Sequence, residues 1–177
     1  MDKKEIKTLV ERYSLTLYGD DNVKFGGTKK ELSEALPTLK ECKWEILAYL
    51  KEQEAERKAR YEDRVARINA IEGLNEIKKA QDDLANWKYE FNKSFDDVGG
   101  FGVRPKPNYD MDKLYEKYPI AASYLKAENY RNKENVELSV IGEKALERII
   151  YHPEEHLEAI EEMNRDLEAF RDRLAFD

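Results

Sequence analysis

Several residue types on which catalytic, metal-binding and membrane proteins depend are scarce in this sequence. There is one cysteine, Cys42, and there are two histidines, which excludes an intrachain disulfide and a cysteine-based metal cluster. A single thiol suits a reducing compartment. No apolar run approaches the length of a membrane span, and the residues that follow Met1 are charged, which argues against a signal peptide. We therefore expect a cytoplasmic protein that does not enter a membrane.

The charge of the chain is acidic and unevenly distributed. The 177 residues include 38 acidic and 31 basic side chains, which gives a formal net charge of -7. Residues 98–177 carry most of this excess. An acidic chain does not attract phosphate backbones by its bulk charge. It can instead approach a basic protein surface, including one that normally holds nucleic acid.

Proline and glycine are scarce in the stretch from Thr38 to Asp97, where Gly73 is the only residue of either type. The stretch opens with a capping box in which Thr38 and Glu41 satisfy each other's backbone amides. It therefore predicts one very long helix, or two collinear helices broken near Gly73.

The apolar residues of this stretch are interrupted in the middle. Residues 51–64 offer nothing more apolar than two alanines and one tyrosine, so we expect them to form a solvated strut. In residues 77–91, apolar side chains recur near a seven-residue spacing. This spacing favours packing against later helices, with self-association into a homodimer as the alternative.

The N-terminal region combines short elements of different periodicity. The spacing in residues 2–13 predicts an amphipathic helix. Residues 15–18 and 23–25 alternate between apolar and polar around a polar turn, which predicts a β-hairpin. A capping box at Thr28–Glu31 opens a short helix. We expect Pro37 to end that helix, because the residue before a proline is disfavoured in the helical conformation.

The C-terminal region predicts a helical bundle. Three glycines and two prolines within residues 98–109 indicate a loop, which we interpret as the reversal between two helical layers. Helical patterns follow, each opened by a capping residue or a proline, and Gly142 in the middle of one of them suggests a close helix crossing. These four patterns begin at Asp110, Pro119, Val136 and Pro153.

Together these patterns predict a mainly α-helical protein with one small β-hairpin. We expect it to consist of a small N-terminal helix–hairpin–helix unit (1–52), a long charged helix or strut (53–97), a Gly/Pro loop (98–109) and a C-terminal helical bundle (110–177).

The first of these segments has a recognisable pattern. Its characteristic residues are Leu9, the strand Leu15–Tyr18, Gly19, the strand Val23–Phe25, Leu39 and the run Lys43–Leu50. This pattern resembles the small N-terminal docking domains of modular peptide and polyketide synthetases. Those domains hold a partner chain against the exposed edge of the hairpin. The resemblance therefore implies a small protein-binding unit.

A second resemblance is carried by the runs Gly102–Pro107, Tyr118–Tyr130 and Gly142–Ile150. They are similar to small proteins of clostridial phages and mobile elements, from which several anti-CRISPR inhibitors come. The resemblance implies a non-enzymatic inhibitor in the cytoplasm of a bacterial host. In its most concrete form, this inhibitor would block a type II CRISPR-associated nuclease from binding or cleaving DNA. The alternatives are a phage replication or assembly accessory that acts as a docking module, and a nucleic-acid-binding protein.

Three groups of residues are candidates for binding a partner. Arginines recur at helical spacing along the predicted strut, where they fit either a solvated face laced with salt bridges or a contact with nucleic acid. The Gly/Pro loop offers aromatic and basic side chains, and the last helix has an acidic face that would suit a basic groove. The three groups are, in that order, Arg57, Arg60, Arg64 and Arg67; Phe101, Arg104, Lys106 and Tyr109; and Glu154, Glu155, Glu158, Glu161, Glu162 and Asp166.

The two histidines are the first and last residues of a run that formally matches a zinc-peptidase pattern, His152-Pro-Glu-Glu-His156. Pro153 forces His152 out of the helix that would hold His156, so the run is better interpreted as a helix start. We find no Ser/His/Asp or Cys/His arrangement, and we expect no catalytic residue, no metal and no cofactor. The expected partner is a host protein, a CRISPR-associated nuclease or its guide complex, with nucleic acid second.

Overall fold

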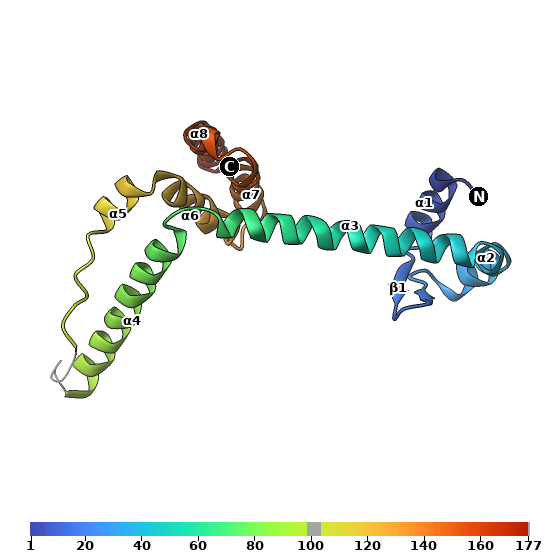
Figure 1. The fold of residues 1–177 in the computed structure, drawn as a ribbon, viewed down its shortest axis with the longest axis horizontal. Coiled ribbons are helices and arrows are strands. Elements are labelled where there is room, and N and C mark those ends of the chain that lie inside the picture. The colour runs from blue at the N-terminus through green and yellow to red at the C-terminus, as the bar shows by residue number, and fades with distance from the viewer. Residues whose placement is uncertain (99–103, 177) are drawn as a thin grey trace. The chain divides into compact units, whose positions relative to one another are not determined.

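The computed structural model describes residues 1–98 and 104–176. Over these residues the chain forms eight α-helices, one short 3-10 helix and one two-stranded hairpin (Figure 1), which confirms the mainly α-helical class. The chain divides into two compact units, unit 1 (Met1–Asp63) and unit 2 (Arg64–Asp177). The narrower segment boundaries expected from the sequence stay predictions.

Unit 1 packs two helices and the hairpin against the start of a third helix. Helix α1 (Lys3–Arg12) begins at Asp2, which forms a capping box with Glu5. Strands β1 (Thr16–Tyr18) and β2 (Asn22–Lys24) follow, and then helix α2 (Lys29–Glu41) and helix α3 (Lys43–Asn69). The main cluster of buried side chains in the unit comprises Ile6, Leu15, Cys42, Ile46 and Leu50.

The hairpin has the predicted antiparallel pairing. Leu17 lies opposite Val23, and both side chains pack against the core of unit 1. Gly19 begins the turn with a φ of 62°, a left-handed conformation that glycine adopts at low cost. A two-stranded hairpin is marginal by itself, so this packing is what stabilises it.

The expectation that Pro37 ends the second helix is wrong. Helix α2 runs through Pro37 to Glu41, and the Cys42 amide donates to the Thr38 carbonyl over 3.0 Å. Thr38 is therefore an internal helical residue and not a cap. The prediction rested only on the local free-energy cost of a proline inside a helix, which is about 3 kcal/mol. Burial of Ala35 before it and partial burial of Leu39 after it favour continuing the helix.

The stretch from Thr38 to Asp97 begins in the last turn of α2 and continues as two further helices, with the predicted break near Gly73. Residues 54–63 of α3 are all exposed, as expected for a solvated segment. Helix α3 ends at Asn69 and helix α4 (Leu74–Val98) begins after Gly73, whose φ is 75°. A side chain at residue 73 would meet the Tyr118 ring at 2.1 Å. The helices are not collinear, because α4 turns away from the last turns of α3 at this break (Figure 1).

Unit 2 is built around three closely packed helices. Helix α5 (Met111–Lys117) leads into α6 (Pro119–Arg131), α7 (Val136–Tyr151), the 3-10 turn η1 (Pro153–Glu155) and α8 (His156–Phe176). The first half of α4 covers one side of α6. The largest fully buried side chains of the unit are Ile77, Leu146, Ile149 and Met163. Among the described helices, no segment combines the length and the apolar character that crossing a bilayer requires.

The structure of unit 2 confirms one prediction made from its sequence and contradicts two others. The close crossing at Gly142 is confirmed, since a Cβ atom there would lie 2.2 Å from the Arg131 amide nitrogen of α6. Pro153 opens a 3-10 turn instead of the last α-helix. The spacing of apolar residues in the last helix predicts that Leu157 faces inward, but it is 64% exposed. The buried face of α8 contains Ala159 instead, and Leu157 lies more than half a turn away from it.

Candidate functional site

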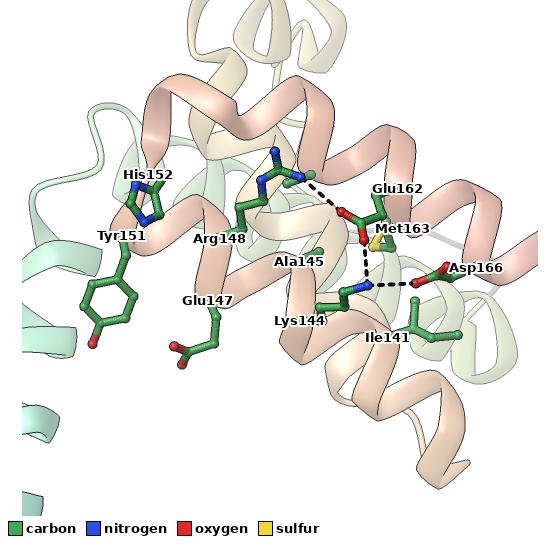
Figure 2. A pocket seen from close by; sticks show the side chains of 11 residues that line it. Ile141, Lys144, Ala145, Glu147, Arg148, Tyr151, His152, Glu162, Met163 and Asp166 are labelled. Carbon is green, nitrogen blue, oxygen red and sulfur yellow. Dashed lines mark hydrogen bonds and ion pairs between the residues drawn. The ribbon is translucent and has the colours of Figure 1, made fainter.

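The ionic groups of unit 2 concentrate where α8 lies against α7 (Figure 2). Arg148 of α7 uses all three guanidinium nitrogens. Its Nε donates to Glu155 at 2.7 Å, its Nη2 to Glu158 at 2.7 Å and its Nη1 to Glu162 at 3.0 Å. A planar guanidinium suits this kind of multiple carboxylate binding better than an ammonium group does. One arginine therefore fixes η1 and the first two turns of α8 onto α7.

Lys144 continues the network one turn earlier on α7. Its Nζ lies 2.6 Å from Glu162 and 3.6 Å from Asp166, so Glu162 bridges the two basic residues. These charges form the rim of a groove of about 440 Å³ whose floor is apolar. Figure 2 shows the apolar residues between the two helices; they include Ile141, Ala145 and Met163.

The structure changes the interpretation of the predicted acidic face. Glu155, Glu158 and Glu162 are bound within the chain by Arg148, and Glu154 lies 3.7 Å from His152. Glu161 is exposed. The sequence could not show the cross-linking, because it depends on the antiparallel register of α7 and α8. Part of the acidic face thus stabilises the fold.

The network predicts that the stability of the fold depends on pH, and that Arg148→Met lowers the stability at neutral pH. Hydrogen bonding to Arg148 lowers the pKa of Glu155, and hydrogen bonding to Lys144 lowers that of Glu162. A carboxylate with a lowered pKa in the folded state stabilises the fold above its unfolded pKa of 4.5. That stabilisation is lost as the pH falls through the lowered folded value. We expect the variant to melt below the wild type at pH 7 and the difference in melting temperature to shrink as the pH falls below 4.5, as measured by circular dichroism.

Arg171→Met is the matched control for this prediction, since Arg171 is exposed on α8. It should leave the pH profile of the melting temperature unchanged. If the wild type melts above Arg148→Met by the same margin at pH 3 as at pH 7, the stabilisation does not come from the ionised carboxylates that Arg148 binds.

The four arginines of α3 that were predicted to bind a partner lie in two different environments. Arg57 and Arg60 are exposed in unit 1. In unit 2, Arg64 pairs with Glu143 at 2.7 Å and also with Glu147, and the hydrogen bond that Arg64 donates to Glu143 raises the pKa of Arg64. Arg67 lies over the Tyr151 ring, 4.9 Å from its centroid. The second half of the stripe therefore packs on α7.

The described part of the Gly/Pro loop lies along α4, and we call Arg104–Tyr109 the strap. Arg104 pairs with Glu90 at 2.7 Å, and the Tyr109 hydroxyl donates to Asp83 at 2.7 Å. The Lys106 ammonium lies 6.0 Å from the centroid of the Trp87 ring. Phe101, which was predicted to join this group, lies outside the described residues.

The two histidines face different partners. His156 Nδ1 lies 3.0 Å from the Ser123 hydroxyl of α6, whereas His152 lies beside Glu154. Ligand atoms of His152, Glu154 and Glu155 fall within 4.8 Å of one another, but Glu155 is already bound by Arg148. Pro153 and the η1 turn cause this divergence, and they disrupt the zinc-peptidase pattern as predicted.

Unit 1 contains a groove that the sequence did not reveal. It has a volume of about 780 Å³ and lies between α1, β1 and α3. Leu15, Leu17 and Tyr49 supply apolar surface, and the charged lining comprises four basic and two acidic residues. These charged residues are Lys3, Lys4, Lys7, Arg57, Glu11 and Glu54. The one signal in the sequence was the clustering of three lysines near the start of α1.

Comparison of the chain with protein-family models, with curated proteins and with solved structures finds no match. The resemblances noted in the sequence therefore stay predictions. The grooves, the charges and the contacts described above are the basis for proposing a function.

Proposed function

We propose that this chain is a non-enzymatic binding protein whose unit 1 holds an extended acidic segment of a partner protein. The observation that carries this proposal is the groove of unit 1, which lies beside a β-strand and is lined mainly by basic and apolar residues.

The position of the groove suits strand addition. Within the described residues, β1 pairs with β2 alone, and the groove is lined by β1 and not by β2. The second edge of β1 therefore has backbone groups available to an added strand, which would gain affinity from main-chain hydrogen bonds. Leu15, Leu17 and Tyr49 would contact apolar side chains of the added segment.

The charge of the groove indicates what that segment contains. Lys3 already pairs with Glu52 at 2.9 Å and Lys7 with Glu11 at 3.7 Å. Lys4 and Arg57 add positive charge at the same rim. An acidic segment would meet complementary potential, which accelerates association and makes binding sensitive to salt.

Charge reversal of the groove tests this proposal. A labelled ten-residue peptide that alternates glutamate and valine should bind the full-length chain in an anisotropy assay. Lys4→Glu/Lys7→Glu should weaken binding about tenfold or more, as expected for about 1.4 kcal/mol. Lys29→Glu/Lys30→Glu makes the same charge change at the start of α2, outside the groove, and should have no effect. Equal losses in both variants would argue against the groove.

A second candidate is the inhibitor predicted from the sequence, which would occupy the basic surface of a CRISPR-associated nuclease. The observation that favours it is the exposed outer edge of the acidic face in unit 2. Glu158 remains 71% exposed although Arg148 binds it, and Glu154 and Glu161 are exposed beside it. These side chains would imitate phosphate groups towards a basic groove.

A cleavage assay with a guide-loaded type II nuclease tests this candidate. Stoichiometric amounts of the chain should inhibit DNA cleavage, and Glu154→Lys/Glu161→Lys should relieve the inhibition. Asp112→Lys/Glu116→Lys places the same charge change on α5 and should inhibit as the wild type does. Unchanged cleavage at a tenfold excess of the chain would rule out the inhibitor form and leave the groove of unit 1 to be tested separately.

A further inference from the structure

The sequence of the strap favours an extended conformation. Arg104 and Lys106 each precede a proline, and the residue before a proline prefers the β or polyproline II region. The prolines themselves have φ fixed near -65°. The run from Arg104 to Pro107 therefore favours a polyproline II segment, which exposes its carbonyl groups because it forms no internal hydrogen bonds.

One tryptophan of α4 contacts this segment in two ways. The Trp87 indole Nε1–H donates to the Arg104 carbonyl at 2.9 Å. The Lys106 ammonium lies over the face of the same ring. An indole that donates to a carbonyl and packs against the chain is a general way of recognising polyproline II segments.

Two carboxylates on the same face of α4 flank the tryptophan. Asp83, Trp87 and Glu90 are spaced i, i+4 and i+7, which places them on one side of the helix. Glu90 accepts from one Arg104 nitrogen at 2.7 and 2.9 Å, and Asp83 accepts from Tyr109 at 2.7 Å. This arrangement of an aromatic ring between two acids is complementary to a basic, proline-containing segment.

The strap is held weakly and does not fill the space above α4. The Arg104 side chain is 77% exposed in its pair with Glu90, and exposed ion pairs stabilise little. A cavity of about 420 Å³ remains between the helix and the two prolines, lined on the helix side by Asn86 and Trp87 among others. A competing segment of the same chemistry would find both the contacts and the room.

We propose that the Asp83–Trp87–Glu90 face of α4 is a binding site for basic proline-rich segments of partner proteins. The strap occupies this site within the chain and competes with them. The site lies in unit 2, so it does not depend on the function proposed for unit 1. Because an intramolecular competitor reduces the apparent affinity by the fraction of sites it occupies, a partner would bind tightly only when the strap is displaced.

Releasing the strap tests the proposal. The probe is a fluorescein-labelled peptide with the sequence of residues 104–109, titrated into the full-length chain. A variant with Arg104→Ala, Pro105→Ala and Pro107→Ala should bind the probe at least tenfold more tightly than the wild type does. Adding Trp87→Ala should abolish that binding. Tyr89→Ala is the matched control, since Tyr89 is 69% exposed on α4 and should leave the affinity unchanged.

A milder variant keeps the test valid if the triple variant does not fold. Tyr109→Phe removes only the hydrogen bond to Asp83 and should raise the affinity for the probe about twofold. A folded triple variant that binds no more tightly than the wild type would overturn the proposal. So would binding that is insensitive to Trp87→Ala. A concentration-dependent dimer of the wild type that Trp87→Ala abolishes would assign the site to a second copy's strap, which also contradicts the form proposed.

Discussion

Gly142→Ala is expected to destabilise unit 2 by about 3 kcal/mol, at the upper end of what overpacking a core costs. In a solvated helix the same change would stabilise by roughly 1 kcal/mol, because alanine has the higher helix propensity. At Gly142 the new Cβ atom would meet backbone atoms of α6, at 2.2 Å from the Arg131 nitrogen and 2.8 Å from the Ala127 oxygen. Backbone atoms cannot rotate away as a side chain does, so α6 and α7 would have to separate.

Urea unfolding followed by far-ultraviolet circular dichroism measures this effect. Val140→Ala is the matched control on the same helix. Val140 is 62% exposed, and its truncation should change the free energy of unfolding by less than about 0.5 kcal/mol. An unfolding midpoint for Gly142→Ala at or above that of the wild type would mean that helix propensity outweighs the crossing.

Ile149→Ala should cost a similar amount for the opposite reason, since it removes volume instead of adding it. The Ile149 side chain is fully buried in the core of unit 2, next to residues such as Leu146 and Met163 that are nearly as buried. Truncation of a buried isoleucine to alanine costs about 2–5 kcal/mol through lost transfer free energy and the cavity left behind. We expect about 3–4 kcal/mol, with a lower urea midpoint and an unchanged slope of the free energy against urea concentration.

Leu157→Ala provides the control for this second prediction. The spacing of apolar residues alone places Leu157 in the core, whereas the structure leaves it 64% exposed. Its truncation should therefore cost less than about 0.5 kcal/mol. Equal losses for Ile149→Ala and Leu157→Ala would show that α8 packs on the face that the sequence pattern suggested.

The elements that the sequence predicted well depend on local signals. The capping box at Thr28 and the polar turn of the hairpin act within a few residues, and the structure contains both, whereas the capping box predicted at Thr38 lies inside α2 and does not start a helix. The helix break near Gly73 is equally local, because only a residue that tolerates a left-handed conformation fits there. Pro37 was misjudged since burial on both sides of it, which depends on packing with distant residues, outweighs its local cost.

The candidate sites depended far more on contacts between distant residues. The acidic face of α8 was visible in the sequence, but its binding to Arg148 and Lys144 requires α7 to lie antiparallel beside it. Arg104 was selected as a partner-binding residue, and the structure instead pairs it with Glu90, which precedes it by 14 residues. The groove of unit 1 brings together residues from Lys3 to Arg57, which belong to three different elements, so periodicity within one helix could not reveal it.

The single thiol of the chain offers a way to follow unit 1 alone. Cys42 is 9% exposed in the core of that unit, and its Sγ lies 3.1 Å from the Met1 sulfur. A thiol reagent in solution reacts with such a side chain when the surrounding structure opens locally. Since residues 64–177 contain no cysteine, the rate of labelling reports how often unit 1 opens, whatever unit 2 does at the same time.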